Sequence, residues 1–221
     1  MAALKDLANN KKVSGFINRY RCKDGSYKYI EWQSQPGVGN FTYSSARDVT
    51  EKKQKEQELQ HLSYHDQLTG LYNRQFLNTI IDDEMTRSEN YEQKLTLCIM
   101  DLDHFKHVND TWGHPIGDEL LKLTAETALE HKRNSDLLIR FGGEEFVMLM
   151  PGTNLDGAIL SLEKIREAIA SMKHPVTGRQ TVSIGIAEKM KHESFFDWYK
   201  RADEALYRAK RGGRNRVEAS V

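Results

Sequence analysis

The chain has 221 residues, enough for one domain of ordinary size and a smaller segment. Lys and Arg together number 32, as do Asp and Glu, so the chain has no general basic field that would attract nucleic acid or an anionic membrane. Its N-terminus lacks the apolar segment of a signal peptide, and its longest apolar run, 95–100, is too short to span a bilayer. We therefore expect a cytoplasmic segment that contacts neither nucleic acid nor membrane, although a fuller chain could be attached to a membrane.

The first 63 residues predict a small β-meander and a helix. Alternating residues between 13 and 49, with two turn sequences, predict three strands in a segment that we assign to 1–47. Such a sheet is too small to form a core of its own. Residues 48–63 are almost purely helical in composition, which predicts either a linker or a short coiled-coil arm to a second subunit.

From residue 64 onward, strand and helix patterns alternate along the chain. This alternation predicts an α+β domain over 64–221, with helices packed on a sheet. The expected strands cover 94–100, 137–141, 146–150, 181–188 and 215–218. The expected helices cover 73–88, 116–131, 155–172 and 195–211. Residues 101–115 are expected to form a loop.

Two aspartates follow the apolar strand expected at 94–100. Asp101 and Asp103 are two residues apart, and side chains at positions i and i+2 of a strand end point to the same side. Both carboxylates could therefore face one ligand. Alternatively, the aspartates belong to a polar loop and cap the helix that follows.

The stretch RFGGEEF (140–146) joins two apolar strands through a tight turn. Gly142 and Gly143 allow backbone angles that other residues resist, and they let a bulky ligand approach the main chain. Glu144 lies at the turn, and Glu145 follows it. A solvated surface hairpin would explain the glycines but not the paired glutamates.

If this hairpin pairs beside the preceding strand, Asp101 and Glu144 come from neighbouring strand ends and meet. Carboxylate oxygens suit Mg²⁺ or Mn²⁺ bound together with substrate phosphates, which is the chemistry of nucleotidyl transfer. Lys106, Lys210 and Arg214 could supply positive charge to the phosphates. For Lys210 and Arg214, a favourable position at a helix C-terminus is an alternative explanation.

Five motifs in order resemble the diguanylate cyclase (GGDEF) family, which makes cyclic di-GMP from two GTP molecules. They are HDQLTGLYNR (65–74), DLDHFKHVNDTWGHPIGDELL (101–121), RFGGEEF (140–146), VSIGIA (182–187) and RADEALYRAKRGGRNRV (201–217). The resemblance covers about 62–218. It implies a palm-like, mostly antiparallel central sheet flanked by helices, as in nucleotide cyclases and polymerase palms.

The resemblance also implies roles for the charged residues near the hairpin. Asp101, Glu144 and the backbone carbonyl of Leu102 would hold Mg²⁺ or Mn²⁺, and Glu144 would act as the base for the attacking 3′-hydroxyl. Lys106 would bind phosphate and stabilise charge on the transferring group. Glu145 would lie near the metal site in a role that stays open.

The substrate GTP would contact a second set of residues in this resemblance. Asn109 and Asp118 would hydrogen-bond the guanine edge, with His114 near the same substrate. The residues expected to approach or hold its phosphates are Gly142, Gly143, Lys106, Lys210 and Arg214.

One such domain would hold one GTP, so the resemblance implies a homodimer with opposed sites. Arg133 and Asp136, in the sequence RNSD, have the family's spacing for a site where the product cyclic di-GMP binds and inhibits. Lys164 stands where the family often has a second arginine in that site. An ordinary salt pair in a loop is the alternative interpretation of Arg133 and Asp136.

The N-terminal segment resembles the last three strands of a PAS sensor domain and its exit helix. Because the first half of that fold is absent, 1–47 is expected to be a partial PAS-like segment without a complete ligand pocket. Asp66 lies in a motif that is structural in the GGDEF family. Trp198 and Tyr199 are expected to be packing residues.

Three functions are compatible with these observations. The first is a diguanylate cyclase with product inhibition, and the second is a non-catalytic receptor for cyclic di-GMP that uses Arg133 and Asp136. The third is a dimerisation scaffold acting through 48–63. The receptor has no need of Asp101 and Glu144, and the scaffold explains none of the carboxylates, so the sequence favours the enzyme.

Overall fold

The structure is a computed structural model that describes residues 12–39 and 41–220. Residues 1–11 and 40, which belong to the expected N-terminal segment, lie outside these ranges, as does residue 221. Within the described ranges, no helix is both long enough and apolar enough to cross a membrane.

The chain divides into two compact units, Met1–His61 and Leu62–Val221. Helix α2 (Thr50–Tyr64) corresponds to the helix predicted over 48–63 and runs through the boundary between the units. The assignment of this helix as a separate linker segment therefore stays a prediction.

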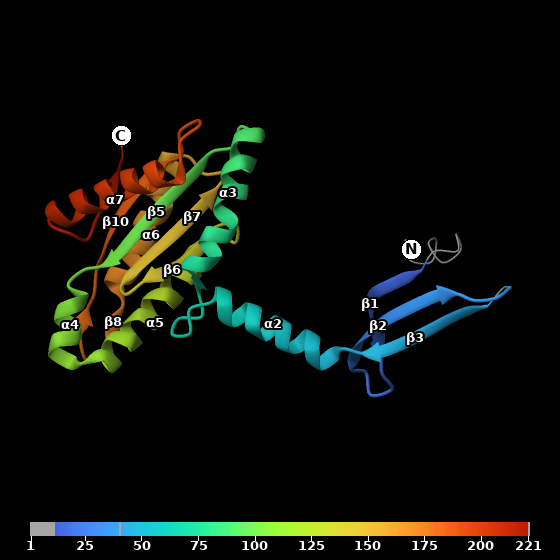
Figure 1. The fold of residues 1–221 in the computed structure, drawn as a ribbon. Helices are drawn as coiled ribbons and strands as arrows, with labels where there is room; N and C mark the ends of the chain where they lie inside the picture. The colour runs from blue at the N-terminus through green and yellow to red at the C-terminus, as the bar shows by residue number, and fades with distance from the viewer. Residues whose placement is uncertain (1–11, 40, 221) are drawn as a thin grey trace. The chain divides into compact units, whose positions relative to one another are not determined.

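The first unit contains a three-stranded antiparallel sheet in the order β1-β2-β3 (Figure 1). Its strands are β1 (Val13–Arg21), β2 (Tyr27–Pro36) and β3 (Thr42–Asp48), which confirms the predicted meander. Every residue of β3 is exposed, and the buried side chains described in this unit are Ser34 and Val49. So small a buried set cannot form an independent core.

The second unit is built on a six-stranded sheet in the order β11-β10-β5-β7-β6-β4 (Figure 1). Its strands are β4 (Tyr72–Asn73), β5 (Leu95–Leu102), β6 (Leu137–Gly142), β7 (Glu145–Pro151), β10 (Val182–Glu188) and β11 (Val217–Ala219). The four central strands pair antiparallel, whereas β4 and β11 pair parallel at the two edges. The short strands β8 (Lys173–His174) and β9 (Gly178–Arg179) form a separate hairpin. The central sheet is therefore mostly antiparallel, as the resemblance implied.

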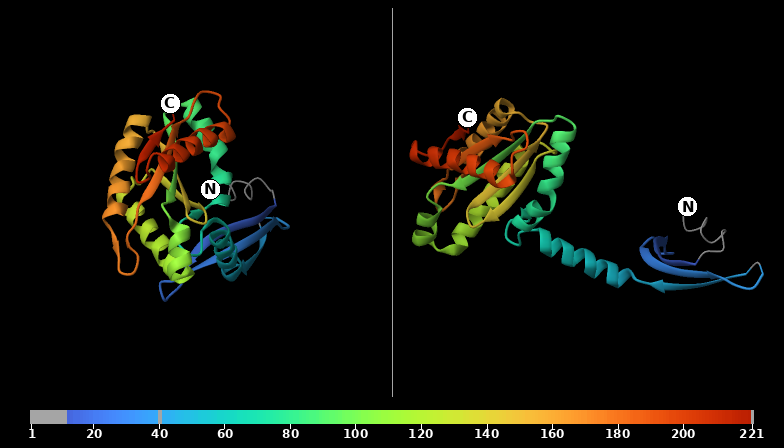
Figure 2. Two further views of the ribbon diagram at one scale, coloured as in Figure 1. Left: turned by 90° about the vertical axis from the view of Figure 1, so that its left-hand side faces the viewer. Right: turned by 45° about the horizontal axis from the view of Figure 1, so that its top comes forward.

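Helices cover both faces of this sheet, which confirms the predicted α+β fold (Figures 1 and 2). The helices are α3 (Arg74–Asn90), α4 (Phe105–Trp112), α5 (His114–His131), α6 (Leu155–Ser171) and α7 (Phe195–Arg211). Helices α3 and α7 pack on one face, and α5 and α6 pack on the other.

Helix α4 occupies part of the segment that we predicted to be a loop, 101–115. Phe105 and Val108 are its buried residues, so its apolar face consists of two side chains. His104, with φ 60°, separates β5 from α4, and Gly113, with φ 81°, separates α4 from α5. The prediction was wrong because a helix of eight residues is too short for its periodicity to be distinguished from a polar loop.

Alternating residues of the central strands fill two cores on opposite faces of the sheet. In β5, Leu97 and Ile99 pack with α3 and α7, whereas Cys98 and Met100 pack with α5 and α6. Burying one aliphatic side chain stabilises the fold by roughly 1.5–3 kcal/mol, so the alternation fixes the face that each strand residue occupies. The same alternation places Asp101 on the face covered by α3 and α7.

Helix α7 lies directly against the sheet at Gly185 of β10. A Cβ atom on Gly185 would lie 2.1 Å from the backbone N of Leu206 and 2.2 Å from the backbone O of Ala202. The buried Trp198 of the same helix donates from Nε1 to the backbone O of Ala187 over 2.8 Å. Backbone contact therefore sets the position of α7 on the sheet.

Candidate functional site

Three segments meet at one end of the central strands: the end of β5, the turn between β6 and β7, and the start of β10. We call this end of the strands the hairpin edge and the opposite end the far edge, as distinct from the edge strands β4 and β11. In the register of the sheet, Asp101 of β5 lies between Glu145 of β7 and Ser183 of β10. The backbone N of Leu102 donates to the backbone O of Glu144 over 3.4 Å. The hairpin therefore pairs beside β5, as predicted, and brings Asp101 and Glu144 into one neighbourhood.

The Asp101 carboxylate pairs with Lys210 of α7, whose Nζ lies 2.9 Å from Oδ2. Burial raises the pKa of Asp101, and the charges of Glu144 and Glu145 raise it further, against the lowering effect of Lys210. The charges of Glu144 and Glu145 thus oppose the ionisation of Asp101, and Lys210 offsets them. Such a group favours the binding of additional positive charge.

Glu145 is held by Tyr199 of α7. The Tyr199 hydroxyl donates to Glu145 Oε1 over 2.5 Å, and its ring stacks on Phe141 with 5.3 Å between centroids. Burial and the Glu145 carboxylate both raise the pKa of Tyr199, so the hydroxyl keeps its proton and acts as a donor. Tyr199, which we expected only to pack, therefore also makes a polar contact within the site.

Asp103 does not share a ligand with Asp101. Its Oδ1 accepts from the Ser183 hydroxyl at 2.7 Å, and its Oδ2 accepts from the Thr181 hydroxyl at 2.6 Å and the Asn215 backbone N at 3.1 Å. The residue is buried. The prediction that both aspartates could face one ligand was wrong, because β5 ends one residue before Asp103 and strand alternation stops there. Asp103 instead ties the edge of the sheet to the C-terminal segment.

Arg140 of β6 anchors the hairpin turn to the loop before β4. Its Nη1 donates to both carboxylate oxygens of Asp66, at 2.9 and 3.1 Å, while Nε and Nη2 donate to the backbone O of Gly143, at 3.1 and 2.8 Å. Burial acts to raise the pKa of Asp66, but hydrogen bonds from Thr69 and Arg140 outweigh it, so the pKa is lowered. No local sequence pattern indicates this bridge, because 74 positions separate the two charged residues.

The structure brings one of the three predicted phosphate-binding cations, Lys210, into contact with the carboxylates. Lys106 lies on α4 and Arg214 lies just after α7, and both are exposed. Within the described chain, neither side chain makes a hydrogen bond or an ion pair. Two positive charges near this edge therefore remain free to meet a ligand.

The predicted guanine-binding residues lie on α4 and on the first turns of α5. Asn109 Oδ1 is buried and, among the atoms described, has no hydrogen-bond partner. It faces Gly117, where a Cβ would lie 2.0 Å from that oxygen. His114 and Asp118 are exposed. Because a buried polar atom without a partner is costly, an acceptor left free beside exposed polar groups fits a ligand-binding role, which for these residues stays a prediction.

The predicted inhibitory-site residues lie in a turn and on α6. Asp136 is buried, and its Oδ2 accepts from the backbone N of Arg133 over 3.1 Å. The exposed Arg133 places Nη1 3.5 Å from Thr153 Oγ1, and Lys164 is exposed on α6. The structure thus presents Arg133 and Lys164 to solvent, whereas Asp136 closes the turn and would have to rotate outward to accept a bond from a ligand.

Comparison with models of known protein families identifies the family of this chain. Residues 63–216 match the model of the family described as "Diguanylate cyclase, GGDEF domain". The chain belongs to the GGDEF family. The resemblance carried by the five sequence motifs is therefore confirmed.

Two curated relatives of this GGDEF protein come from Escherichia coli (strain K12). The diguanylate cyclase DgcM is 38% identical over 223 residues, which cover 100% of this chain and 54% of DgcM. The probable diguanylate cyclase DgcC is 37% identical over 186 residues, which cover 83% of this chain and 49% of DgcC. The chain therefore spans about half the length of these relatives.

Solved GGDEF structures share the fold. The coiled coil and GGDEF domain of DgcB from Caulobacter crescentus, in complex with c-di-GMP, gives a TM-score of 0.73 at 34% identity and covers 77% of this chain and 93% of that one. The active GGEEF domain of a diguanylate cyclase from Vibrio cholerae gives a TM-score of 0.64 at 30% identity and covers 67% and 97%. These similarities support the palm-like arrangement of the sheet.

In this GGDEF domain, the groups that could hold a divalent cation are the carboxylates of Asp101 and Glu144 and the backbone O of Leu102. Within the part of the chain that the structure describes, no cluster of three or more His, Cys, Asp or Glu side chains could hold a metal ion by itself. Mg²⁺ is usually bound by one or two carboxylates together with substrate phosphates and water. The paired carboxylates fit such a shared site, in which the nucleotide supplies the remaining ligands.

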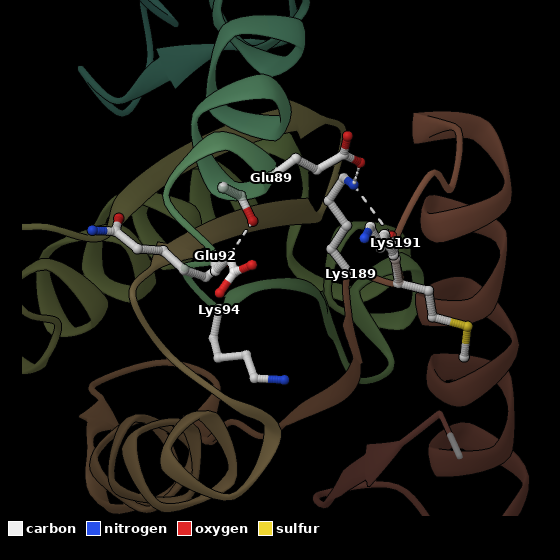
Figure 3. A pocket seen from close by; sticks show the side chains of 8 residues that line it. Glu89, Glu92, Lys94, Lys189 and Lys191 are labelled. Carbon is white, nitrogen blue, oxygen red and sulfur yellow. Dashed lines mark hydrogen bonds and ion pairs between the residues drawn. The ribbon is translucent and has the colours of Figure 1, made fainter.

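A pocket at the far edge, near the start of β5 and the end of β10, is lined by charges that are largely paired with one another (Figure 3). It is lined by Ser88, Glu89, Glu92, Gln93, Lys94, Lys189, Met190 and Lys191. Glu89 and Lys189 point toward each other with 2.5 Å between Oε1 and Nζ, and Lys94 pairs with Glu188 over 2.6 Å. None of the predicted site residues lines this pocket, and these pairs balance their charges within the chain.

Proposed function

We propose that this GGDEF domain condenses two GTP molecules into cyclic di-GMP and releases two pyrophosphates. The observation that carries the proposal is the meeting of Asp101 and Glu144 at one sheet edge beside Lys210. Two carboxylates and a lysine suit a divalent cation that arrives with a triphosphate. The names of the relatives DgcM and DgcC support the same reaction.

Each half of the reaction exchanges one bond to phosphorus for another. The 3′-hydroxyl of one GTP attacks the α-phosphorus of the other, an O–P bond forms, and the bond to the leaving pyrophosphate breaks. Glu144 accepts the proton of the hydroxyl, while Lys106, Lys210 and Arg214 hold the phosphates by charge. Mg²⁺ or Mn²⁺, when bound, supplies charge neutralisation at the phosphates and acidifies the attacking hydroxyl.

The nucleotide is oriented by its guanine and by the shape of the turn. In the proposal, Asn109 and Asp118 hydrogen-bond the guanine edge, with His114 beside them. Apart from each glycine and its two chain neighbours, no atom lies within 4 Å of the positions that Cβ atoms on Gly142 and Gly143 would occupy, so the turn leaves open space for phosphates. This space supports the approach of the α-phosphate to the main chain.

The catalytic unit in this proposal is a homodimer, because one site holds one GTP and the product contains two. Two copies have to face each other with their hairpin turns opposed. Leu59 and Leu62 of α2 are 66% and 50% exposed, which supports the interpretation of this helix as an arm that meets a second copy.

We also propose that cyclic di-GMP inhibits the enzyme by binding at Arg133. The exposed guanidinium can donate two parallel hydrogen bonds to a guanine edge or a phosphate, and Lys164 adds a second charge. Asp136 supports Arg133 through the backbone hydrogen bond described above. The binding of c-di-GMP in the DgcB structure is consistent with such a site in this family.

Chromatography of a reaction with GTP and Mg²⁺ tests the cyclase activity directly. We expect cyclic di-GMP and pyrophosphate from the wild type, and a loss of roughly 10²-fold or more for Glu144→Gln. Product from Glu144→Gln at the wild-type rate would contradict the assignment of the base. If the wild type makes no product at high concentration but binds cyclic di-GMP through Arg133, the receptor function is correct.

A second measurement tests the inhibitory site. Arg133→Ala should keep the initial rate of the wild type and lose inhibition by added cyclic di-GMP. Equal inhibition of the wild type and the variant would sink this part of the proposal.

A further inference from the structure

The contact between Tyr199 and Glu145 is not used by the reaction as described above. Tyr199 lies on α7, Glu145 lies at the start of β7, and their 2.5 Å hydrogen bond joins these elements at the edge that carries Asp101. We propose that Tyr199 is a positioning residue, which holds the Glu145 carboxylate in place beside Asp101 and thereby strengthens the binding of a divalent cation. This inference rests on the proposed function, because it concerns the same cation site.

Glu145 stands in the position from which its charge can act on Asp101. The two residues are directly opposite in the antiparallel pairing of β5 and β7, so their side chains emerge on the same face, about 4.5–5.5 Å apart at Cβ. A third negative charge is therefore present where the cation is expected. The orientation of the Glu145 carboxylate decides how strongly that charge attracts the cation.

The ring of Tyr199 packs against two aromatic neighbours. It stacks on Phe141 of β6 at 5.3 Å and meets Phe195 at 5.9 Å between centroids. The Arg74 guanidinium of α3 lies 4.6 Å from the centroid of Phe141. The ring is thus held by β6 and α7, with Arg74 of α3 behind Phe141, and in this position the hydroxyl donates to Glu145.

One oxygen of Glu145 is thus occupied while the other carries no hydrogen bond within the described residues. A carboxylate restrained in this way loses less conformational entropy when a cation approaches. Hydrogen bonds to the carboxylates around a metal typically change its affinity by about 10- to 100-fold. We expect the hydroxyl of Tyr199 to act at the lower end of that range.

Tyr199→Phe removes the hydroxyl and keeps the ring, so the stack on Phe141 is preserved. The affinity of the full chain for Mn²⁺ alone, followed by the electron paramagnetic resonance signal of free Mn²⁺, should weaken by roughly 10-fold. Tyr207→Phe is a matched control, because Tyr207 lies on the same helix, is 61% exposed and makes no hydrogen bond through its hydroxyl among the described residues. It should bind Mn²⁺ as the wild type does.

A double-mutant cycle identifies the residue through which Tyr199 acts. Glu145→Gln should also weaken Mn²⁺ binding, and adding Tyr199→Phe to it should have no further effect. An unchanged affinity in Tyr199→Phe, or an equal loss in the presence and absence of the Glu145 carboxylate, would overturn the inference. Failure of the wild type to bind Mn²⁺ would overturn both this inference and the proposed cation site, whereas unchanged binding in Tyr199→Phe alone would leave the proposed function standing.

Discussion

The two edges of the six-stranded sheet treat their charges in opposite ways. At the edge that ends β7 and β10, carboxylates and cations pair off within the chain: Glu188 with Lys94, Glu89 with Lys189, and Glu193 with Arg201. At the edge that begins β7, Asp101 pairs with Lys210, but Glu144 has no ion pair in the described chain, and Lys106 and Arg214 have none either. The unpaired charges of Glu144, Lys106 and Arg214 thus lie where a ligand is expected to bring the balancing charge.

The two edges also differ in how their ionised carboxylates affect the stability of the fold. Paired charges at the far edge lower the pKa values of Glu188 and Glu193, so they add to stability at neutral pH. At the hairpin edge, the raised pKa of Asp101 means that its ionised form opposes folding in the absence of a cation. The charge that attracts a cation therefore lowers the stability of the fold when no cation is bound.

The largest expected effect comes from replacing one carboxylate at each edge with the matching amide. Asp101→Asn should reduce cyclase activity by about 10²-fold or more, because a cation ligand is lost. Its melting temperature without divalent cations should rise or stay level, because the neutral side chain removes an unfavourable charge. Glu188→Gln should do the reverse, with wild-type activity and a lower melting temperature. Chromatography of the product and calorimetry measure both, and a strongly destabilised Asp101→Asn would contradict the comparison.

Two arginines offer a matched pair of bridges for the second prediction. Arg140 joins Asp66 to the backbone O of Gly143, and Arg201 joins Glu193 to the backbone O of Glu188. Arg140 makes its contacts through Nε, Nη1 and Nη2, and Arg201 binds Glu193 through both Nε and Nη2. The single ammonium of lysine cannot replace all of these donors, so Arg140→Lys and Arg201→Lys should each lose about 1–2 kcal/mol of stability in denaturant unfolding.

Activity should distinguish the two arginine variants. Arg140→Lys should lower kcat/KM for GTP by roughly 10- to 100-fold, because the turn carrying Glu144 is no longer held in place. Arg201→Lys should retain the wild-type value. Equal activity in both variants would show that the bridge at Arg140 has no part in positioning the turn.

Two glycines at opposite ends of β7 give a smaller and cleaner test. Gly143 has φ 54° and Gly152 has φ 66°, and nothing lies within 4 Å of a Cβ on either. Alanine at each position should cost about 1–2 kcal/mol for the left-handed backbone and lower the melting temperature by similar amounts. Gly143→Ala should in addition raise the KM for GTP several-fold, because the methyl group enters the space proposed for phosphates. A matching rise in Gly152→Ala would break the assignment.

The smallest effect is a difference in sign between two pH profiles. The pKa of Asp101 is raised from 3.8, so its protonated form stabilises the fold below that pH and this contribution is lost as pH rises through the raised value. Burial acts to raise the pKa of Glu188, but hydrogen bonds from Lys94 and the Leu155 amide lower it from 4.5, so its contribution is present above that pH and lost on acidification.

Melting temperatures between about pH 3.5 and pH 7, without divalent cations, measure this difference. Asp101→Asn should exceed the wild type at neutral pH and converge with it in acid. Glu188→Gln should fall below the wild type at neutral pH and converge from the other side. Profiles of the same sign would refute the contrast between the edges.

The long helices and central strands were predictable because their apolar residues repeat over enough positions to set a period. The two-residue strand β4 and the helix α4 were missed because neither is long enough for such a repeat. The alternation that correctly placed Asp101 failed two residues later, because the backbone leaves the strand direction at Asp103 and His104.

The candidate site was predictable where its residues belong to one motif and hidden where they meet across the fold. Asp101, Glu144 and Lys210 could be inferred from family motifs whose spacing survives in this chain. The contacts of Arg140 with Asp66 and of Tyr199 with Glu145 join positions 74 and 54 residues apart. Only the pairing of strands and the packing of α7 bring such residues together, so no local pattern announces them.

Gly185 is a position at which the domain cannot accept a larger residue without moving α7. Backbone atoms of α7 occupy the space that any side chain would need there, so even alanine would push the helix away from the sheet. Lys210 and Tyr199 would move with it, and their contacts to Asp101 and Glu145 would be lost in one step. A single added methyl group at Gly185 could thus abolish the activity of a related domain in which the charged residues of the site are all retained.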